Sequence, residues 1–478
     1  MTRVEDKEIE IRNLAKVYST HPDLFKLHTF VEDAELLEPL GIRIPYKDVL
    51  PQGFLKFTPS DFIVEEVDEK GEVCTIERRN LASEADLPEA QSYFATLVKC
   101  GIQTEEAIRD LAELLDCPKE NIRYAGIKDK DAITAQRISI KGVSPEKIRS
   151  ASSAHFFLKD VTAGVGVMDR GKLTGNRFTI FMRLPAPLEK TEKKDIFMQA
   201  VERVTHGEVY NFYYLQRFGT PRLSNFRWAY SIIKGDYGKA VKQYLTESSP
   251  NELPYVQFLR NEVLARWGSW RECIEYFEPF PVLFDCELRI LRHLLNHEGD
   301  YVGALQQIPE QIMLWVYAVS SWLFNEKLSI YAQVGGPLPK ELPLFLSFDR
   351  KDLEPYRNIL EDNHMYPPPF RNLKPFPAIR LMHRTVDTKV DAKMHSVKIT
   401  NEGVALSFTL DKGQYATTFL AHLFVLLSGK PPEEIPDIVV DTKSLLGEGS
   451  SESAIEFFKE VLHTKRDNIF EKLIGEEN

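Results

Sequence analysis

Alternating apolar and polar positions predict strands at five places along the chain: residues 54–57, 62–67, 136–140, 176–184 and 404–410. Apolar residues at helical spacing predict helices at residues 5–18, 104–115, 189–205 and 453–463. Thr104 is expected to cap the second of these helices, because glutamates occupy its first turn. Strands interleaved with helices indicate an α/β or α+β core.

The pattern changes near residue 225, and the chain stays helical and rich in aromatic residues to about residue 330. Short similar segments begin at Gly235, Gly268 and Gly299, with spacings that suit stacked helical hairpins. Turns at the starts of helices explain these segments equally well. A proline-rich stretch follows at residues 338–380, and the strand pattern then resumes. A helical block is therefore expected to interrupt a domain that contains a sheet.

The expected organisation has five segments. Residues 1–50 form an N-terminal extension and residues 431–478 a C-terminal extension. Residues 51–208 and 386–430 are the two parts of one catalytic domain, and residues 209–385 are an insertion between them.

The composition is that of a soluble globular protein, with 43% hydrophobic and 27% charged residues among 478. The longest apolar run, residues 312–324, is too short to span a membrane, and the N-terminus lacks the apolar core of a signal peptide. The five cysteines form no Cys-x-x-Cys pair, which favours reduced thiols in a cytoplasmic protein without a zinc ribbon. We expect a monomer with no membrane partner.

Charge is unevenly distributed along the chain. The net charge is −11, which alone argues against a nucleic-acid partner. However, residues 121–150 hold seven Lys/Arg against three Asp/Glu, whereas residues 431–478 hold five against twelve. Because affinity for nucleic acid depends on the local patch, the basic middle of the chain permits binding to RNA.

Several standard catalytic motifs are absent. The sequence has no phosphate-binding Gly-x-x-x-x-Gly-Lys-Ser/Thr loop, no His-Glu-x-x-His and no Gly-x-Ser-x-Gly. The histidines show no metal-binding spacing. We therefore expect no cofactor and no metal, and a catalytic role must depend on side chains alone.

The polar segment Tyr-Ala-Gly-Ile-Lys-Asp-Lys-Asp-Ala-Ile-Thr-Ala-Gln at residues 124–136 is the main candidate for such chemistry. Lys128 and Lys130 flank Asp129, and neighbouring cations favour an ionised carboxylate that can act as a nucleophile. Asp131 is a rival that pKa reasoning alone cannot separate from Asp129. By composition alone, a solvated loop of mixed charge is the better explanation of the segment.

This segment resembles the active-site motif of the TruD family of tRNA pseudouridine synthases, roughly Ala-Gly-x-Lys-Asp-x-x-Ala-x-Thr-x-Gln. Four more segments are similar to family motifs in the same order, at residues 54–66, 172–178, 211–219 and 408–417. A smaller match lies at residues 321–325. The sequence departs from the pattern at Tyr214, Asp411 and Gln414, which affects the expected substrate preference more than the reaction.

The resemblance implies an α+β pseudouridine-synthase domain with a mixed, mostly antiparallel sheet, interrupted by a largely helical inserted domain. It implies that Asp129, in preference to Asp131, is the nucleophile and that Lys56 keeps it ionised. The implied substrate-contacting residues are Phe62, Asn176, Phe178 and Tyr415, and the implied RNA-backbone contacts are Lys128, Arg217 and Arg222.

Each of these assignments has a structural alternative. Phe62 and Phe178 lie on alternating strands, where packing in the core is the commoner role. Arg217 could form a structural ion pair instead of binding phosphate.

The activity implied by the resemblance is isomerisation of a uridine to pseudouridine in tRNA, at uridine 13 of the D-arm, with the base flipped out of its stack. One alternative is a non-catalytic RNA-binding or RNA-folding protein on the same scaffold. Another is an adaptor whose helical segment, residues 225–330, binds a partner. The second leaves the polar segment unexplained.

Overall fold

The computed structural model describes residues 3–78, 87–190, 192–334 and 337–466. Its contacts divide them into two compact units. The sheet unit comprises residues 46–209 and 389–466, and the helical unit comprises residues 3–45 and 210–388. The helical unit thus interrupts the chain of the sheet unit.

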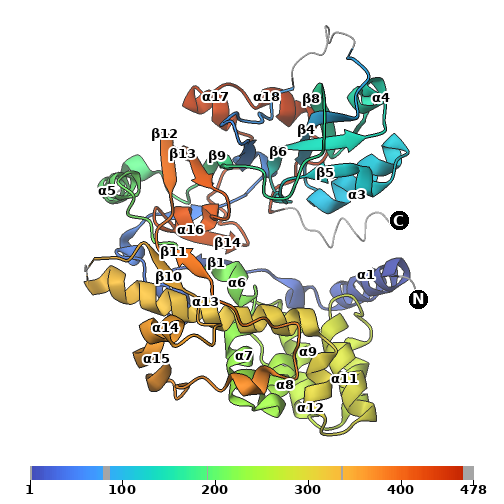
Figure 1. Cartoon of the computed structure of the whole chain (residues 1–478), viewed down its shortest axis with the longest axis vertical. Helices are drawn as coiled ribbons and strands as arrows, with labels where there is room; N and C mark the ends of the chain where they lie inside the picture. The colour runs from blue at the N-terminus through green and yellow to red at the C-terminus, as the bar shows by residue number, and fades with distance from the viewer. Residues whose placement is uncertain (1–2, 79–86, 191, 335–336, 467–478) are drawn as a thin grey trace. The chain divides into compact units, whose positions relative to one another are not determined.

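The sheet unit is built on one mixed sheet, with strands in the order β14–β2–β9–β3–β6–β4–β8–β7 (Figure 1). Strand β13 also pairs with β9 and β12, and β5 pairs with β6. Most neighbours are antiparallel, but β3–β6 and β14–β2 are parallel. The strands are β2 (Gln52–Phe54), β3 (Phe62–Val67), β4 (Ser92–Cys100), β5 (Ile122–Tyr124), β6 (Ile133–Lys141), β7 (Ser152–Ser153), β8 (Phe156–Gly164), β9 (Gly175–Arg183), β12 (Ala392–Ile399), β13 (Gly403–Asp411) and β14 (Val425–Gly429).

Helices cover both faces of this sheet. Leu97 of β4 faces one apolar cluster with α3, whereas its neighbour Val98 faces a second cluster with Ala454 and Phe458 from the C-terminal region. Successive residues of a strand point to opposite faces, which is why both faces need a cover. The helices of this unit are α3 (Thr104–Leu115), α4 (Pro145–Ser150), α5 (Lys193–Thr205), α16 (Ala416–Ala421), α17 (Thr442–Leu446) and α18 (Glu452–Phe457).

The described part of the segment expected to be a C-terminal extension is therefore part of the core of the sheet unit. Phe458 stacks on Phe157 of β8 with ring centroids 5.7 Å apart. Lys443 forms a buried ion pair with Glu65 of β3, at 2.7 Å. The acidic composition of this segment did not indicate this role, because a few apolar residues are enough to cover one face of a sheet.

The helical unit contains most of the remaining helices and a short two-stranded sheet of β10 and β11 (Figure 1). Its elements are α1 (Arg3–Thr20), β1 (Thr29–Glu32), α2 (Ala34–Leu37), α6 (Leu215–Phe218), α7 (Asn225–Lys234), α8 (Tyr237–Thr246), α9 (Pro254–Ala265), α10 (Trp270–Phe277), α11 (Asp285–Asn296), α12 (Tyr301–Gln306), α13 (Pro309–Val334), β10 (Glu341–Pro343), α14 (Arg350–Leu353), α15 (Arg357–Asp362) and β11 (Thr385–Asp387). No helix among the described residues is long and apolar enough to cross a membrane.

The three similar segments of this unit are starts of helices. Gly235, Gly268 and Gly299 all have left-handed backbone conformations, with φ of 85°, 100° and 77°. Asp236 and Asp300 then cap α8 and α12 through their side chains. Glycine adopts positive φ without the steric cost of a Cβ atom, so the similarity follows from turn chemistry.

Candidate active site

The polar segment around Asp129 forms a loop between β5 and β6 that is held at its start by two hydrogen bonds. The carbonyl of Gly126 accepts a hydrogen bond from Gln136 Nε2 at 2.9 Å. The carbonyl of Ala125 accepts one from the backbone N–H of Gly171 at 2.8 Å. Because these bonds come from residues outside the loop, its backbone has a defined position.

Lys56 lies beside Asp129, although the two residues are far apart in the sequence. Lys56 Nζ is 3.1 Å from Asp129 Oδ1, and 41% of the aspartate side chain is exposed. Lys56 has a φ of 59°, a left-handed conformation that is uncommon for a residue with a long side chain. Such conformations persist where the surrounding structure holds them, and they concentrate at functional sites. An exposed carboxylate is thus paired with a cation held in an unusual backbone conformation.

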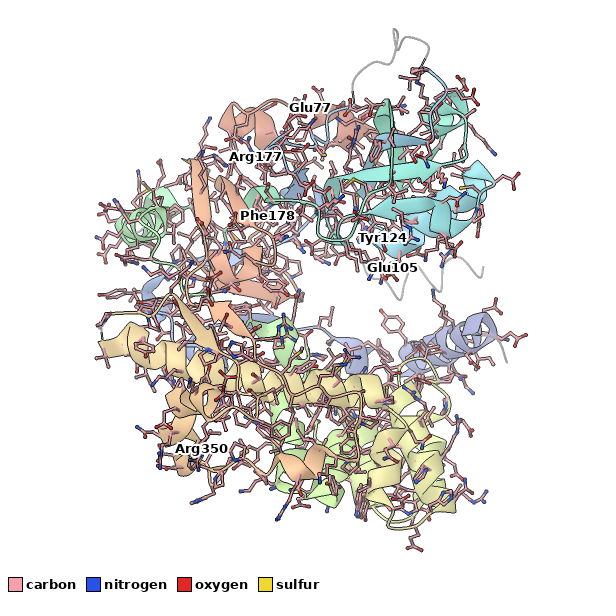
Figure 2. All side chains as sticks on the ribbon, viewed as in Figure 1. Glu77, Glu105, Tyr124, Arg177, Phe178 and Arg350 are labelled. Atoms are coloured by element: carbon pink, nitrogen blue, oxygen red, sulfur yellow. The ribbon has the colours of Figure 1, made fainter. Side chains whose placement is uncertain are left out.

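Aromatic rings lie next to this pair. Lys56 Nζ is 4.1 Å from the centroid of the Phe62 ring, and Phe62 contacts Phe178 edge to face at 5.9 Å. Phe178, labelled in Figure 2, stacks on Phe408 at 5.3 Å. Phe62 and Phe178 are only 2% and 5% exposed, so both are packed in the core of the sheet unit. Substrate contact by these two rings stays a prediction.

Asn176 is joined to the site through Lys128. Lys128 Nζ donates a hydrogen bond to Asn176 Oδ1 at 2.6 Å and lies 2.8 Å from Glu66 Oε2. Lys128 and Glu66 are both buried. A buried ammonium paired with a carboxylate is not available to a phosphate. We therefore correct the expected RNA-backbone contact for Lys128 and reassign this residue to a structural ion pair that orients Asn176.

Thr104 and Lys99, for which the sequence predicted no role in the site, hold the backbone of the loop. Thr104 Oγ1 accepts a hydrogen bond from the N–H of Lys128 at 3.0 Å and donates one to the carbonyl of the same residue at 3.3 Å. Lys99 Nζ donates to the carbonyl of Asp129 at 2.6 Å. Burial lowers the pKa of Lys99 to about 8, and Asp129 opposes this shift. A lysine within the apolar pattern of a strand is the signal that could have indicated Lys99.

Thr104 is thus a loop anchor, whereas the sequence predicted a helix cap. It is the first residue of α3, and no cap hydrogen bond is made by the side chain at the preceding N-cap position. Periodicity could not reveal this role, because the hydroxyl binds a residue 24 positions away.

We expect a Thr104→Val variant to have a free energy of unfolding about 1–3 kcal/mol lower, because two buried hydrogen bonds to the loop are lost. Valine has nearly the shape of threonine, so packing is preserved. Urea unfolding measures the effect. The control is Thr104→Ser, which keeps the hydroxyl and should stay near the wild-type stability. Equal stabilities for the valine and serine variants would contradict this anchoring role.

Asp131 has a different partner. Lys465 Nζ is 3.0 Å from Asp131 Oδ2. Partial burial raises the pKa of Asp131, but the charge and hydrogen bond of Lys465 outweigh it, and the pKa is lowered. Ionisation therefore does not exclude Asp131 as a nucleophile. Asp129 differs from Asp131 in its surroundings, because Asp129 lies beside Lys56 and the aromatic rings.

Tyr415 is placed near the site by backbone register. Leu410 of β13 pairs with Asn176 of β9, and Tyr415 follows in the turn before α16. Its side chain is 48% exposed, which suits contact with a ligand. Its role as a substrate-binding residue stays a prediction.

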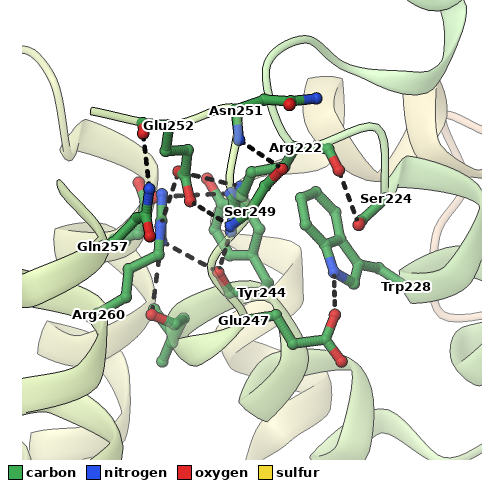
Figure 3. A network of polar contacts seen from close by, with 12 residues as sticks. Arg222, Ser224, Trp228, Tyr244, Glu247, Ser249, Asn251, Glu252, Gln257 and Arg260 are labelled. Atoms are coloured by element: carbon green, nitrogen blue, oxygen red, sulfur yellow. Dashed lines mark hydrogen bonds and ion pairs between the residues drawn. The ribbon is translucent and has the colours of Figure 1, made fainter. Parts of the chain in front are cut away.

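The two candidate arginines lie in the helical unit. Arg222 belongs to a charged network with Glu252 and Arg260, which are labelled in Figure 3. Glu287 also pairs with both arginines. Arg222 donates a hydrogen bond to the carbonyl of Tyr244 at 2.6 Å, and its side chain is only 10% exposed. We correct the expected phosphate contact for Arg222, because its charge is compensated within the helical unit.

Arg217 differs from Arg222. Its guanidinium lies 5.0 Å from the centroid of the Tyr213 ring, and no ion pair of Arg217 occurs among the described residues. Its phosphate contact stays a prediction.

The site offers a carboxylate, an ammonium, an amide and aromatic rings. Within the described part of the chain, no group of three or more His, Cys, Asp or Glu side chains is placed to hold a metal ion. The side chains can supply a nucleophile, a positive charge paired with it, and surfaces for a planar ligand.

The comparisons with known proteins agree on one family. The model of the family described as tRNA pseudouridine synthase D (TruD) matches residues 50–343. A probable tRNA pseudouridine synthase D of Methanopyrus kandleri is 29% identical over 351 residues, which cover 68% of this chain and 84% of that protein. One of Methanococcus aeolicus is 27% identical and covers 80% of this chain and 99% of that protein.

A solved structure has a similar fold. The crystal structure of the putative tRNA pseudouridine synthase D of Methanosarcina mazei matches with a TM-score of 0.66 at 21% identity. The match covers 81% of this chain and 97% of that chain.

Proposed function

The chain belongs to the TruD family of tRNA pseudouridine synthases and is an isomerase, and from this premise we propose that it converts uridine 13 of tRNA to pseudouridine with Asp129 as the nucleophile. The predicted fold is confirmed, an α+β fold with a mixed, mostly antiparallel sheet and a helical insertion. The observation that carries the proposal is the 3.1 Å pair of Asp129 and Lys56 in a fixed, exposed loop.

The reaction exchanges one bond to the ribose for another. The bond from N1 of uracil to C1′ breaks, the uracil rotates, and a bond from C5 to C1′ forms. The proton at C5 is lost, and N1 ends protonated, so no redox partner is required. Attack of Asp129 on the ribose, attack on the base and abstraction of a ribose proton all use the carboxylate of Asp129, which lies 3.1 Å from Lys56 Nζ.

The surroundings of Asp129 support binding of a flipped uracil. Leaving the stack costs a few kcal/mol, which contacts in the pocket must offset. Tyr415 presents an exposed ring, and Asn176 presents an amide for the hydrogen-bonding edge of the base. Phe62 and Phe178 would form an apolar floor beneath the uracil. A tRNA substrate also supports the expected cytoplasmic location.

We expect the purified protein to place pseudouridine at nucleotide 13 of a tRNA transcript. Chemical mapping of pseudouridine along the whole transcript measures this directly. The matched control is the same transcript with cytidine at position 13, which should yield no product. Product at another position, with or without the cytidine, would contradict the site preference while leaving the activity established.

A further inference from the structure

A hollow in the sheet unit lies beside the loop that carries Asp129 (the catalytic loop), and none of the candidate site residues lines it. Its volume is about 580 Å³, and β5, α3 and residues 167–170 contribute to its walls. Glu105 and Tyr124, both labelled in Figure 2, line it. A cavity of this volume is large enough to hold a nucleotide.

The lining combines three kinds of group that match the parts of a nucleotide. Tyr124, Val167 and Met168 offer apolar and aromatic surface to a flat base. Glu105 and Glu120 are exposed carboxylates that can accept hydrogen bonds from a ribose hydroxyl or an amino group of the base.

Three cations at the rim suit a phosphate. Lys119, Arg123 and Arg170 are exposed, and none of them forms an ion pair within the described residues. The neighbouring carboxylate of Asp169 is already paired with Lys172 at 2.7 Å. Unpaired cations beside an apolar wall are typical of sites that bind single-stranded nucleic acid.

The hollow is also structurally continuous with the catalytic loop. Tyr124 directly precedes the loop, and the backbone N–H of Gly171, next to the wall residue Arg170, donates to the carbonyl of Ala125 at 2.8 Å. The N–H of Met168 donates to Ser139 Oγ of β6 at 2.8 Å. A ligand in the hollow would therefore contact residues that lie close to Asp129 in the sequence.

We propose that this hollow binds a nucleotide of the substrate RNA that flanks the target uridine. This inference depends on the proposed function. Flipping the target removes one stacking partner from each neighbouring base, and the face of Tyr124 supplies a replacement for one of them. The hollow would then stabilise the distorted RNA that the reaction requires and contribute to the choice of substrate.

The test asks whether the loss of a single base in the RNA and the loss of the Tyr124 ring in the protein have a shared effect on affinity. Transcripts that each carry one abasic nucleotide next to the target are titrated against the wild type, Tyr124→Leu and Tyr124→Phe. Loss of one stacked base should weaken wild-type binding about tenfold at one flanking position. Tyr124→Leu should bind the intact transcript about tenfold more weakly and show no further loss at that position. Tyr124→Phe keeps the ring and should behave like the wild type.

A second variant keeps the test valid if Tyr124→Leu is poorly folded, since Tyr124 also packs against the core. Arg123 is exposed, and Arg123→Ala should reduce the slope of log affinity against log salt by about one. The proposal is overturned if the abasic nucleotide weakens binding equally in every variant and the salt slope of Arg123→Ala is unchanged. Pseudouridine formation by the wild type on the intact transcript is measured in parallel and reports on the proposed function alone.

Discussion

An Asp129→Asn variant should form pseudouridine at least about a thousandfold more slowly than the wild type, because the amide is neutral and cannot act as the nucleophile. Asparagine has the same shape and keeps an oxygen that can accept a hydrogen bond from Lys56, so the loop should remain folded. Product from a tRNA transcript, mapped chemically after single turnover, is the measurement.

The matched control is Asp131→Asn. This change removes the pair with Lys465 but leaves Asp129 and Lys56 in place. Its rate should remain within about tenfold of the wild type, because a partly exposed ion pair contributes only about 1 kcal/mol. If Asp131→Asn abolishes product while Asp129→Asn retains it, the assignment of the two carboxylates is reversed.

Lys128→Met should lower the free energy of unfolding by about 3–5 kcal/mol, because it leaves the buried Glu66 carboxylate without its partner. Urea unfolding measures this change. Lys130→Met is the matched control, since Lys130 is an exposed lysine of the same loop and its replacement should alter stability by less than about 0.5 kcal/mol.

A double variant separates the two possible roles of Lys128. Glu66→Gln with Lys128→Met removes both charges and should recover part of the stability lost by Lys128→Met alone. A phosphate contact predicts a different result for Lys128→Met, with unchanged stability and a smaller salt dependence of tRNA binding. That outcome would restore Lys128 to the RNA-binding residues.

Local sequence patterns located many of the secondary-structure elements. The helix predicted at residues 104–115 is α3, and the strand predicted at 62–67 is β3. The helix predicted at 453–463 is shorter, as α18 ends at Phe457. Periodicity identifies such elements because the alternation of buried and exposed positions is a local property of the chain.

The partners of charged side chains could not be predicted from local sequence patterns. Lys128 and Lys130 both flank Asp129 in the sequence, yet the first is buried against Glu66 and the second is exposed. Arg222 and Arg217 are separated by five positions, yet only Arg222 joins the charged network of Figure 3. Burial depends on contacts between distant segments, so the resemblance implied phosphate contacts for Lys128 and Arg222 that neither side chain has the exposure to make.

By itself, the sequence determined the family, the α+β class and the loop that carries Asp129, because these depend on residue order and short motifs. Only the tertiary structure decided that Lys56 lies against Asp129, that Thr104 and Lys99 hold its backbone, and that the C-terminal region closes a core. The physical reason is that a side chain acquires its charge partner and its degree of burial only when distant segments pack together.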